Sequence, residues 1–309
     1  MVESGAAPIL RRTDLCAVVV TYFPDTGCGE NLTALAGQVD CLVIVDNGSS
    51  EDSLRPVVEA ARRLSATLVR LGANLGVAAA LNVGIRFARE RGYHWLATFD
   101  QDSRATPTMI ETMAATLARY PQADRVAVIS PRHVDRLIGF TVTERGAEAK
   151  GIGWRVIPSV MTSGNLVRLD AAIAVGGFDE RLFIDYVDHD FCLKLRRRGF
   201  RVLQATAAQL LHSLGSMDRR LLLVKRINVT HHAALRRYYI SRNRLVLWQR
   251  YWRQEPVWVL RDVRRFFSEA VYMLLFEREV SKKLRMMARG IRDALNGRLG
   301  PCASGSLES

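Results

Sequence analysis

Short apolar runs alternate with amphipathic stretches through the first half of the chain. Residues 15–22 form an unbroken apolar run rich in β-branched side chains, as in a strand covered on both faces of a parallel sheet. The expected strands are residues 15–22, 41–45, 66–71 and 95–99, and the expected helices are residues 31–39, 52–64 and a stretch with Asn82 and Gly84 near its start. Strands and helices that alternate at this interval predict an open parallel α/β sheet.

The pattern becomes less regular after the fourth strand. Residues 107–118 predict a helix and residues 126–129 a short buried strand, whereas residues 132–158 are uneven and fit either edge strands or a flap. A helix is expected from Asp188 to the Gly199 stop, because its apolar positions are followed by basic residues and a glycine. The last strand is expected in two pieces, residues 201–204 and 208–211, which end at His212.

The last third of the chain has helical spacing. Apolar positions recur between residues 257 and 276, and Arg261, Arg264 and Arg265 fall on the polar face of the same helix. We therefore expect a leader over residues 1–13, an α/β domain over 14–215 and a basic, amphipathic helical region over 216–309.

Charge is concentrated in that helical region. The whole chain of 309 residues has a formal net charge of +13, and the stretch from Ser216 to the end holds 20 Lys and Arg against 8 Asp and Glu, or +12. This asymmetry predicts an anionic partner for the tail, which is a membrane surface, a nucleic acid or a phosphorylated substrate.

The cysteines and the N-terminus predict a cytoplasmic protein. The five cysteines are odd in number and contain no C-x-x-C pair, which favours reduced thiols. Residues 1–10 lack a signal-peptide pattern, and we expect no transmembrane span because no apolar run reaches about 18 residues.

Polar clusters follow the predicted strands directly, at Thr21-Tyr22, Asp46–Ser49, Asn74–Gly76 and Asp100–Asp102. In a parallel sheet these positions meet at one edge, where ligands bind. Asp100 and Asp102 project the same way if the strand geometry continues. Two adjacent carboxylates are stabilised by a divalent cation such as Mg²⁺ or Mn²⁺, or one of them holds a ligand hydroxyl. The alternative is a solvated Asp-Gln-Asp-Ser turn.

Six segments together resemble the inverting family-2 glycosyltransferases, which have a GT-A fold. The segments are VVVTYFPD, IVDNGSS, the Asn-x-Gly stretch at Asn74, FDQDS, GGFDERLFIDYVDHDFCLKLRRRG and LHSLGS, and they cover about residues 14–215. The later segment LRRYYISRNRLVLWQRY, with Asp-Gln-Asp-Ser, is similar to the bacterial rhamnosyltransferases of that family. This resemblance implies dTDP-L-rhamnose as the donor.

The resemblance also implies roles for individual residues. The nucleotide-sugar would be bound by Thr21, Tyr22, Asp46, Asn47, Asn74, Gly76, Asp100, Gln101, Arg236 and Tyr238. The metal, Mg²⁺ or Mn²⁺, would be held by Asp102, Asp100 and His212 and would stabilise the departing diphosphate. The acceptor would contact Ser163, Gly164 and Asp190.

Asp188 is the expected general base, since an inverting displacement needs a carboxylate to take the proton of the acceptor hydroxyl. Family members often have an acidic residue where Val187 stands, so the choice between Asp188 and Asp185 stays open.

The amphipathic tail helix favours peripheral contact with the inner face of an anionic cytoplasmic membrane. This contact would bring the protein to a lipid-linked or glycolipid acceptor. The alternative is that its apolar stripe packs on the α/β domain or on a second subunit, as a homodimer.

Three other functions fit the sequence less well. A nicotinamide-dependent dehydrogenase would need G-x-G-x-x-G after the first strand, where the chain has Thr21-Tyr-Phe-Pro. A nucleic-acid-binding protein would leave Asp100, Asp102 and Asp188 without a purpose, so no nucleic acid is expected. A catalytically inactive relative that acts as a membrane-associated scaffold is the alternative to an enzyme.

Overall fold

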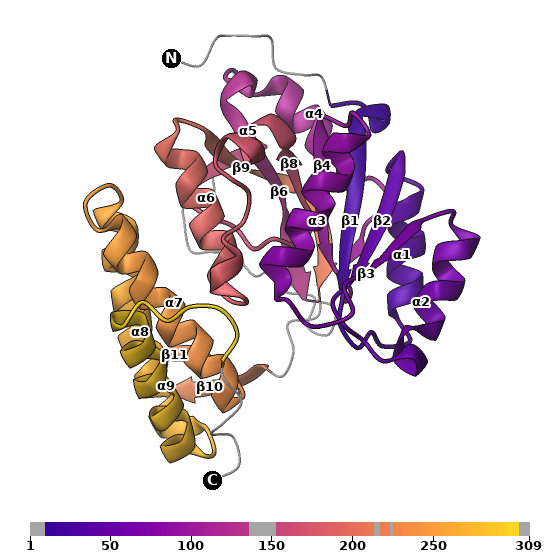
Figure 1. Cartoon of the computed structure of the whole chain (residues 1–309). Helices are drawn as coiled ribbons and strands as arrows, with labels where there is room; N and C mark the ends of the chain where they lie inside the picture. Colours follow the sequence, from indigo (N-terminus) through magenta and orange to yellow (C-terminus); the bar gives the residue numbers. More distant parts are fainter. Residues whose placement is uncertain (1–9, 136–152, 213–216, 223–224, 231, 303–309) are drawn as a thin grey trace. The chain divides into compact units, whose positions relative to one another are not determined.

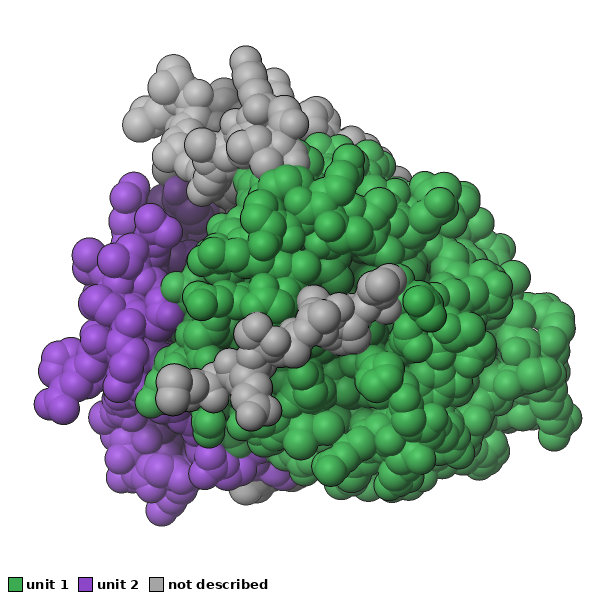
Figure 2. Space-filling view, turned by 90° about the horizontal axis from the view of Figure 1, so that it is seen from above, with its two compact units in different colours: residues 1–180, 188–213 green, residues 181–187, 214–309 purple. Residues whose placement is uncertain are grey.

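The computed structural model describes residues 10–135, 153–212, 217–222, 225–230 and 232–302. The middle of the expected flap, residues 136–152, lies outside this part of the chain. The chain divides into two compact units, coloured separately in Figure 2. The first unit comprises residues 1–180 and 188–213, and the second comprises residues 181–187 and 214–309.

Four parallel strands form one half of the sheet in the first unit (Figure 1). They are β1 (Leu15–Thr21), β2 (Cys41–Asp46), β3 (Thr67–Arg70) and β4 (Trp95–Asp100), in the order β3-β2-β1-β4. Each of the first three is followed by a helix, α1 (Cys28–Ala36), α2 (Glu51–Arg63) and α3 (Val77–Glu90). The α/β class that the apolar runs predict is therefore confirmed for this half.

The other half of the sheet is mixed, which corrects the expectation of a parallel sheet throughout. It contains β8 (Asn165–Arg168), β6 (Val126–Asp135), β9 (Arg201–His212), β5 (Arg104–Ala105) and β7 (Trp154–Ile157), and the helices α4 (Met109–Arg119), α5 (Leu169–Ala174) and α6 (Val187–Arg197). Strand β8 runs antiparallel to both β4 and β6, whereas β9 is parallel to β6.

Alternate residues of the central strands pack on opposite faces of the sheet. Leu15, Ala17 and Val19 of β1 belong to the core that also contains side chains of α1, α2 and α4. Val18 points to the other face, toward Gly84 of α3. Both faces are therefore buried, as the unbroken apolar runs predict.

Gly84 is a sensitive packing position. A Cβ atom at Gly84 would lie 2.7 Å from Val18 Cβ, inside contact distance. We expect Gly84→Ala to lower the free energy of unfolding by about 1–3 kcal/mol through overpacking, measured by urea denaturation. Gly37→Ala is the control, because nothing lies within 4 Å of a Cβ there. Equal stability of the two variants would contradict this packing.

The second unit contains a hairpin and three helices. Strands β10 (Met217–Leu222) and β11 (Lys225–Thr230) pair antiparallel, and α7 (Ala234–Tyr251), α8 (Pro256–Phe276) and α9 (Val280–Leu295) follow. A Cβ at Gly290 of α9 would lie 3.2 Å from Arg242 N of α7, so a glycine lets these helices approach closely. Within the described residues, no helix is both long and apolar enough to cross a bilayer.

Candidate active site

Strands β1, β2 and β4 end at the same edge of the sheet and carry the predicted polar residues there. Thr21 is in register with Asp46, and Val20 is in register with Asp100. Thr21 Oγ1 donates a hydrogen bond of 3.1 Å to Asp46 Oδ1, and both side chains are buried. The expected convergence of these clusters is therefore observed for the first, second and fourth strands.

Asp46 organises the loop after β2. Its Oδ2 accepts hydrogen bonds from the amides of Gly48 and Ser49, at 3.2 and 3.0 Å, and its Oδ1 accepts one from Ser49 Oγ at 2.5 Å. With the Thr21 bond, four donors converge on this carboxylate. Asp46 thus anchors the loop, and a contact to the nucleotide base remains a prediction.

Asn47 and Asn74 lock two loops together beside Asp46. Asn47 Nδ2 donates to Asn74 Oδ1 at 3.0 Å, and Asn47 Oδ1 accepts from the Leu75 amide at 2.9 Å. Asn74 Oδ1 also accepts from the Gly76 amide at 3.0 Å. These residues form a rigid wall at the edge of the sheet, as a preformed ligand site requires.

Tyr22 and Gln101 join the ends of β1 and β4. The Tyr22 amide donates to Gln101 Oε1 at 2.8 Å, and Gln101 Nε2 donates to the Tyr22 carbonyl at 3.2 Å. The Tyr22 side chain is 45% exposed. An exposed aromatic ring held by its backbone offers a surface on which a nucleotide base can stack.

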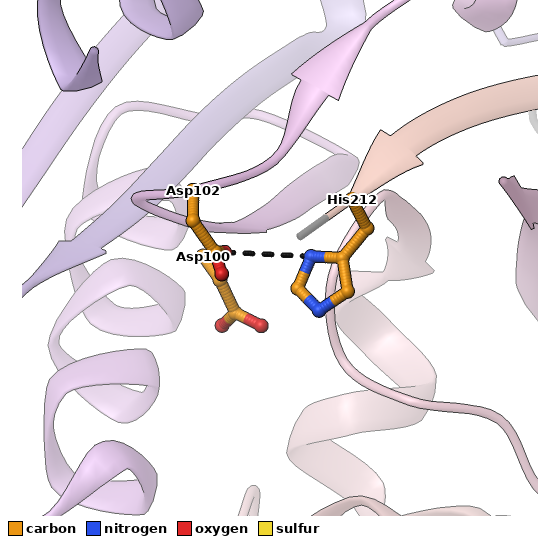
Figure 3. A group of neighbouring side chains, drawn as sticks. All are labelled: Asp100, Asp102 and His212. Atoms are coloured by element: carbon orange, nitrogen blue, oxygen red, sulfur yellow. Dashed lines mark ion pairs between the residues drawn. The ribbon is translucent and has the colours of Figure 1, made fainter. Parts of the chain in front are cut away.

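The predicted metal ligands lie together. One ligand atom from each of Asp100, Asp102 and His212 lies within 4.8 Å of the others, and the side chains point toward one another in Figure 3. Asp100 ends β4, Asp102 lies in the following turn and His212 ends β9. Asp102 Oδ1 is buried, lies 3.4 Å from His212 Nδ1 and accepts no hydrogen bond from the described residues. Two carboxylates and an imidazole are ligands that suit Mn²⁺ or Mg²⁺. The buried Asp102 oxygen is consistent with such a site.

Two serines connect the parts of this metal cluster. Ser103 Oγ lies 2.7 Å from His212 Nδ1, and Ser163 Oγ donates to Ser103 Oγ at 2.7 Å. Ser163 Oγ also accepts from the Asp100 amide at 3.0 Å, so the two serines connect the end of β4 to His212. Ser163 is therefore buried behind the metal ligands, and its expected contact with the acceptor remains a prediction.

His133 of β6 supports the same serine. His133 Nε2 lies 2.9 Å from the Ser163 carbonyl, and burial lowers the pKa of His133 to about 4. A neutral ring therefore donates to this carbonyl at physiological pH. Neither Ser103 nor His133 is predicted as a site residue from the sequence, although Ser103 directly follows the acidic pair.

We expect Ser103→Ala to weaken the affinity for Mn²⁺ by about 10–100-fold, because groups that orient a metal ligand have effects of this size. Isothermal titration with Mn²⁺ measures this change. Ser53→Ala, a half-buried serine in the first turn of α2 and outside the metal cluster, is the control. Unchanged affinity in Ser103→Ala would show that the serine does not orient His212.

Asp188 and Asp190 lie in the first turn of α6. Asp188 lines a small cleft together with Thr98, Thr162 and Asn165, among other residues. Asn165 Oδ1 is buried there and accepts no hydrogen bond from the described part of the chain.

Asp190 is fully buried, and its carboxylate lies 3.4 Å from Lys194 Nζ. Its environment supports a structural contribution to α6, and its predicted contact with an acceptor is untested.

Gly164 lies at the start of β8 with a φ of +80°. Its amide donates to the Thr98 carbonyl at 2.6 Å, and a Cβ would lie 2.8 Å from Leu210 Cδ2. Glycine is therefore required by backbone conformation and packing. A role in acceptor binding stays a prediction.

Arg236 and Tyr238 belong to the second unit, where both side chains contact protein groups. Arg236 Nη2 lies 3.1 Å from Asp185 Oδ1. The Tyr238 hydroxyl donates to Asp293 Oδ2 at 2.9 Å, and Tyr238 is buried. The structure thus leaves the expected nucleotide contacts of Arg236 and Tyr238 as predictions.

The sheet, its loop edge and the acidic cluster have the arrangement expected of a nucleotide-sugar transferase with a GT-A fold. Residues 16–148 match the family model described as Glycosyl transferase family 2. Residues 16–148 therefore form a family-2 glycosyltransferase domain, and the chain is a glycosyltransferase.

Rhamnosyltransferases are among its relatives. The chain is 26% identical over 307 residues to the dTDP-rhamnosyl transferase RfbF of Shigella flexneri, an alignment that covers 95% of this chain and 98% of the relative. It is 25% identical over 241 residues to the N-acetylglucosaminyl-diphospho-decaprenol L-rhamnosyltransferase of Mycobacterium tuberculosis, with 65% and 76% of the chains covered.

Two solved structures share the fold. GalNAc-T7, crystallised with UDP, GalNAc and Mn²⁺, superposes with a TM-score of 0.58 at 12% identity, covering 91% of this chain and 56% of that chain. The mannosyltransferase PcManGT of Pyrobaculum calidifontis, in complex with GDP-Man and Mn²⁺, gives a TM-score of 0.52 at 16% identity, covering 98% and 79%.

Proposed function

We propose that the protein is an inverting, metal-dependent rhamnosyltransferase that moves L-rhamnose from dTDP-L-rhamnose to a hydroxyl of a lipid-linked glycan or glycolipid. The observation that carries the proposal is the cluster of Asp100, Asp102 and His212 at the ligand-binding edge of the sheet. The choice of donor and acceptor is supported by the two rhamnosyltransferase relatives. The proposed setting is cell-envelope polysaccharide synthesis at the cytoplasmic face of the membrane.

The donor would bind along the ends of β1, β2 and β4. The Tyr22 ring would stack on the thymine, while Asn47 and Asn74 keep the adjacent loops in place. Asp100, Asp102 and His212 would hold Mn²⁺ or Mg²⁺. The cation supplies positive charge that stabilises the departing nucleoside diphosphate.

Asp188 would accept the proton of the acceptor hydroxyl as that oxygen attacks the anomeric carbon from the face opposite the diphosphate. Asp188 lines the cleft with Thr98 and Asn165, and its Oδ1 accepts a hydrogen bond from the His189 amide at 2.8 Å. Asp185, the other candidate, forms an ion pair with Arg236 at 3.1 Å. The Asp185 carboxylate is engaged by a guanidinium, whereas Asp188 lines a cleft, which favours Asp188 as the base.

Helix α8 supports the membrane contact. Its exposed apolar residues include Val257, Leu260, Phe267, Val271, Leu274 and Leu275. Arg261 and Arg264 are exposed on the same helix, so apolar and cationic groups alternate over its surface. Such a surface suits the headgroup layer of an anionic membrane, where each basic residue contributes about 1 kcal/mol.

We expect the protein to sediment with phosphatidylglycerol vesicles at low salt, and the double variant Leu260→Glu/Phe267→Glu to lose most of this binding. Val156→Glu on β7, which is 50% exposed, is the control. Absence of the wild-type protein from the anionic vesicle pellet would contradict membrane contact. A dimer that dissociates in the double variant would instead assign the α8 face to a homodimer.

A panel of donors tests the function. Nucleoside diphosphate release is measured from dTDP-L-rhamnose, UDP-GlcNAc and GDP-mannose in the presence of a polyprenyl-diphosphate-GlcNAc acceptor. The proposal requires the highest kcat/KM with dTDP-L-rhamnose. Binding of nucleotide without turnover of any donor would favour the inactive scaffold.

A further inference from the structure

The segment before the proposed base has a conformation that side chains rarely adopt. Residues 183–186 connect η3 (Glu180–Leu182) to α6, in which Asp188 is the second residue. Phe183, Asp185 and Tyr186 have φ values of +68°, +61° and +63°. L-residues disfavour this region, and several such residues in one segment persist only where surrounding contacts hold them.

Asn243 of α7 supplies such contacts. Its Nδ2 lies 2.9 Å from the Leu182 carbonyl, 2.8 Å from the Ile184 carbonyl and 2.9 Å from the Asp185 carbonyl. Asn243 is fully buried. Its amide therefore satisfies backbone acceptors that water does not reach, where an unpaired carbonyl is costly.

Arg242 is the neighbouring residue on α7 and holds the same segment. Its Nη2 donates to the Leu182 carbonyl at 2.9 Å, and its Nη1 donates to the Gly300 carbonyl at 2.6 Å. Its Nε donates to Asn243 Oδ1 at 3.0 Å, which orients the asparagine amide toward the segment. Arg242 is also fully buried, and its Nη1 and Nη2 atoms donate to backbone carbonyls, not to a phosphate.

Side chains of the segment are held as well. The Phe183 ring stacks on Tyr239 with a centroid distance of 5.2 Å. The Tyr186 hydroxyl donates to Asp262 Oδ1 at 2.8 Å and accepts from Arg244 Nε. Residues of both α7 and α8 therefore contact residues 182–186.

We infer that Arg242 and Asn243 are positioning residues that set the start of α6, and with it Asp188, by clamping residues 182–186 to the helical unit. The division between the two compact units falls between Val187 and Asp188, so the clamped segment leads directly into the proposed base. The basic helical region would then affect catalysis by holding the backbone that precedes Asp188. This effect would not require contact between the region and the donor. This role rests on the proposed function, because it concerns the base of that reaction.

Hydrogen exchange and kinetics together test the clamp. In Asn243→Ala, amides of residues 183–188 should exchange about tenfold faster or more, as expected when several buried hydrogen bonds are lost. The kcat for rhamnose transfer should fall about tenfold or more, because small misplacements of a catalytic group are costly, while the Kd for dTDP-L-rhamnose stays unchanged. Tyr186→Phe keeps the aromatic ring and is expected to fold. It should also raise the exchange rates of these amides and lower kcat, both by less than Asn243→Ala does.

Val246→Ala is the matched control, because Val246 is buried on the same helix and its substitution removes only packing. An equal loss of kcat in Val246→Ala would show that general destabilisation is responsible and would overturn the clamp. Unchanged exchange or unchanged kcat in Asn243→Ala, beside an active wild type, would also overturn it. Absence of turnover in the wild type would refute the proposed function itself and this role with it.

Discussion

Asp188→Asn is expected to lower kcat for sugar transfer by about 10²–10⁴-fold, the contribution of a positioned general base. The amide keeps the size of the carboxylate and cannot take the proton of the acceptor hydroxyl. Because Asp188 contacts the acceptor side of the reaction in this account, the Kd for dTDP-L-rhamnose should stay within about twofold of the wild type. Steady-state kinetics and isothermal titration measure the two quantities.

Asp185→Asn is the matched control for this substitution. It removes the ion pair with Arg236 and should lower kcat far less than Asp188→Asn. A larger loss in Asp185→Asn than in Asp188→Asn would assign the base to Asp185 and contradict the present assignment.

Asp102→Ala is expected to abolish stimulation by Mn²⁺ and to lower kcat/KM by at least about 100-fold, because a Lewis-acidic cation stabilises the transition state by several kcal/mol. Asp102 provides the buried oxygen that faces His212 and accepts no hydrogen bond from the described residues. Titration of activity with Mn²⁺ from metal-free protein measures the effect.

Asp124→Ala provides the control for Asp102→Ala. Asp124 lies in η2 (Ala123–Arg125), outside the metal cluster. A variant lacking Asp102 that keeps full stimulation by Mn²⁺ would show that the cation binds elsewhere.

The sequence predicted the features that depend on local pattern. The apolar runs of residues 15–22 and 95–99 correspond to β1 and β4, because a strand buried on both faces needs apolar side chains at every position. The proximity of Asp100 and Asp102 was predicted from the period of two along a strand, but the strand ends at Asp100 and the following turn brings Asp102 beside it. The mixed half of the sheet was missed, since the four residues of β8 have no local feature that sets their direction.

The partners of polar side chains could not be predicted. Arg242 and Asn243 have the donors that bind phosphate, but burial directs them to backbone carbonyls. Ser103 looks like an ordinary turn residue, and its contact with His212 joins positions 109 residues apart in the sequence. The β10–β11 hairpin also lay outside the expectation of a mostly helical tail.

The most direct test of the central claim is transfer of rhamnose from dTDP-L-rhamnose to a polyprenyl-diphosphate-GlcNAc acceptor, with Mn²⁺ or with a chelator. The product is analysed by NMR at the anomeric carbon. The account predicts transfer only with the cation, and an anomeric configuration opposite to that of the donor. Equal transfer in the presence of the chelator, or retention of configuration, would contradict it.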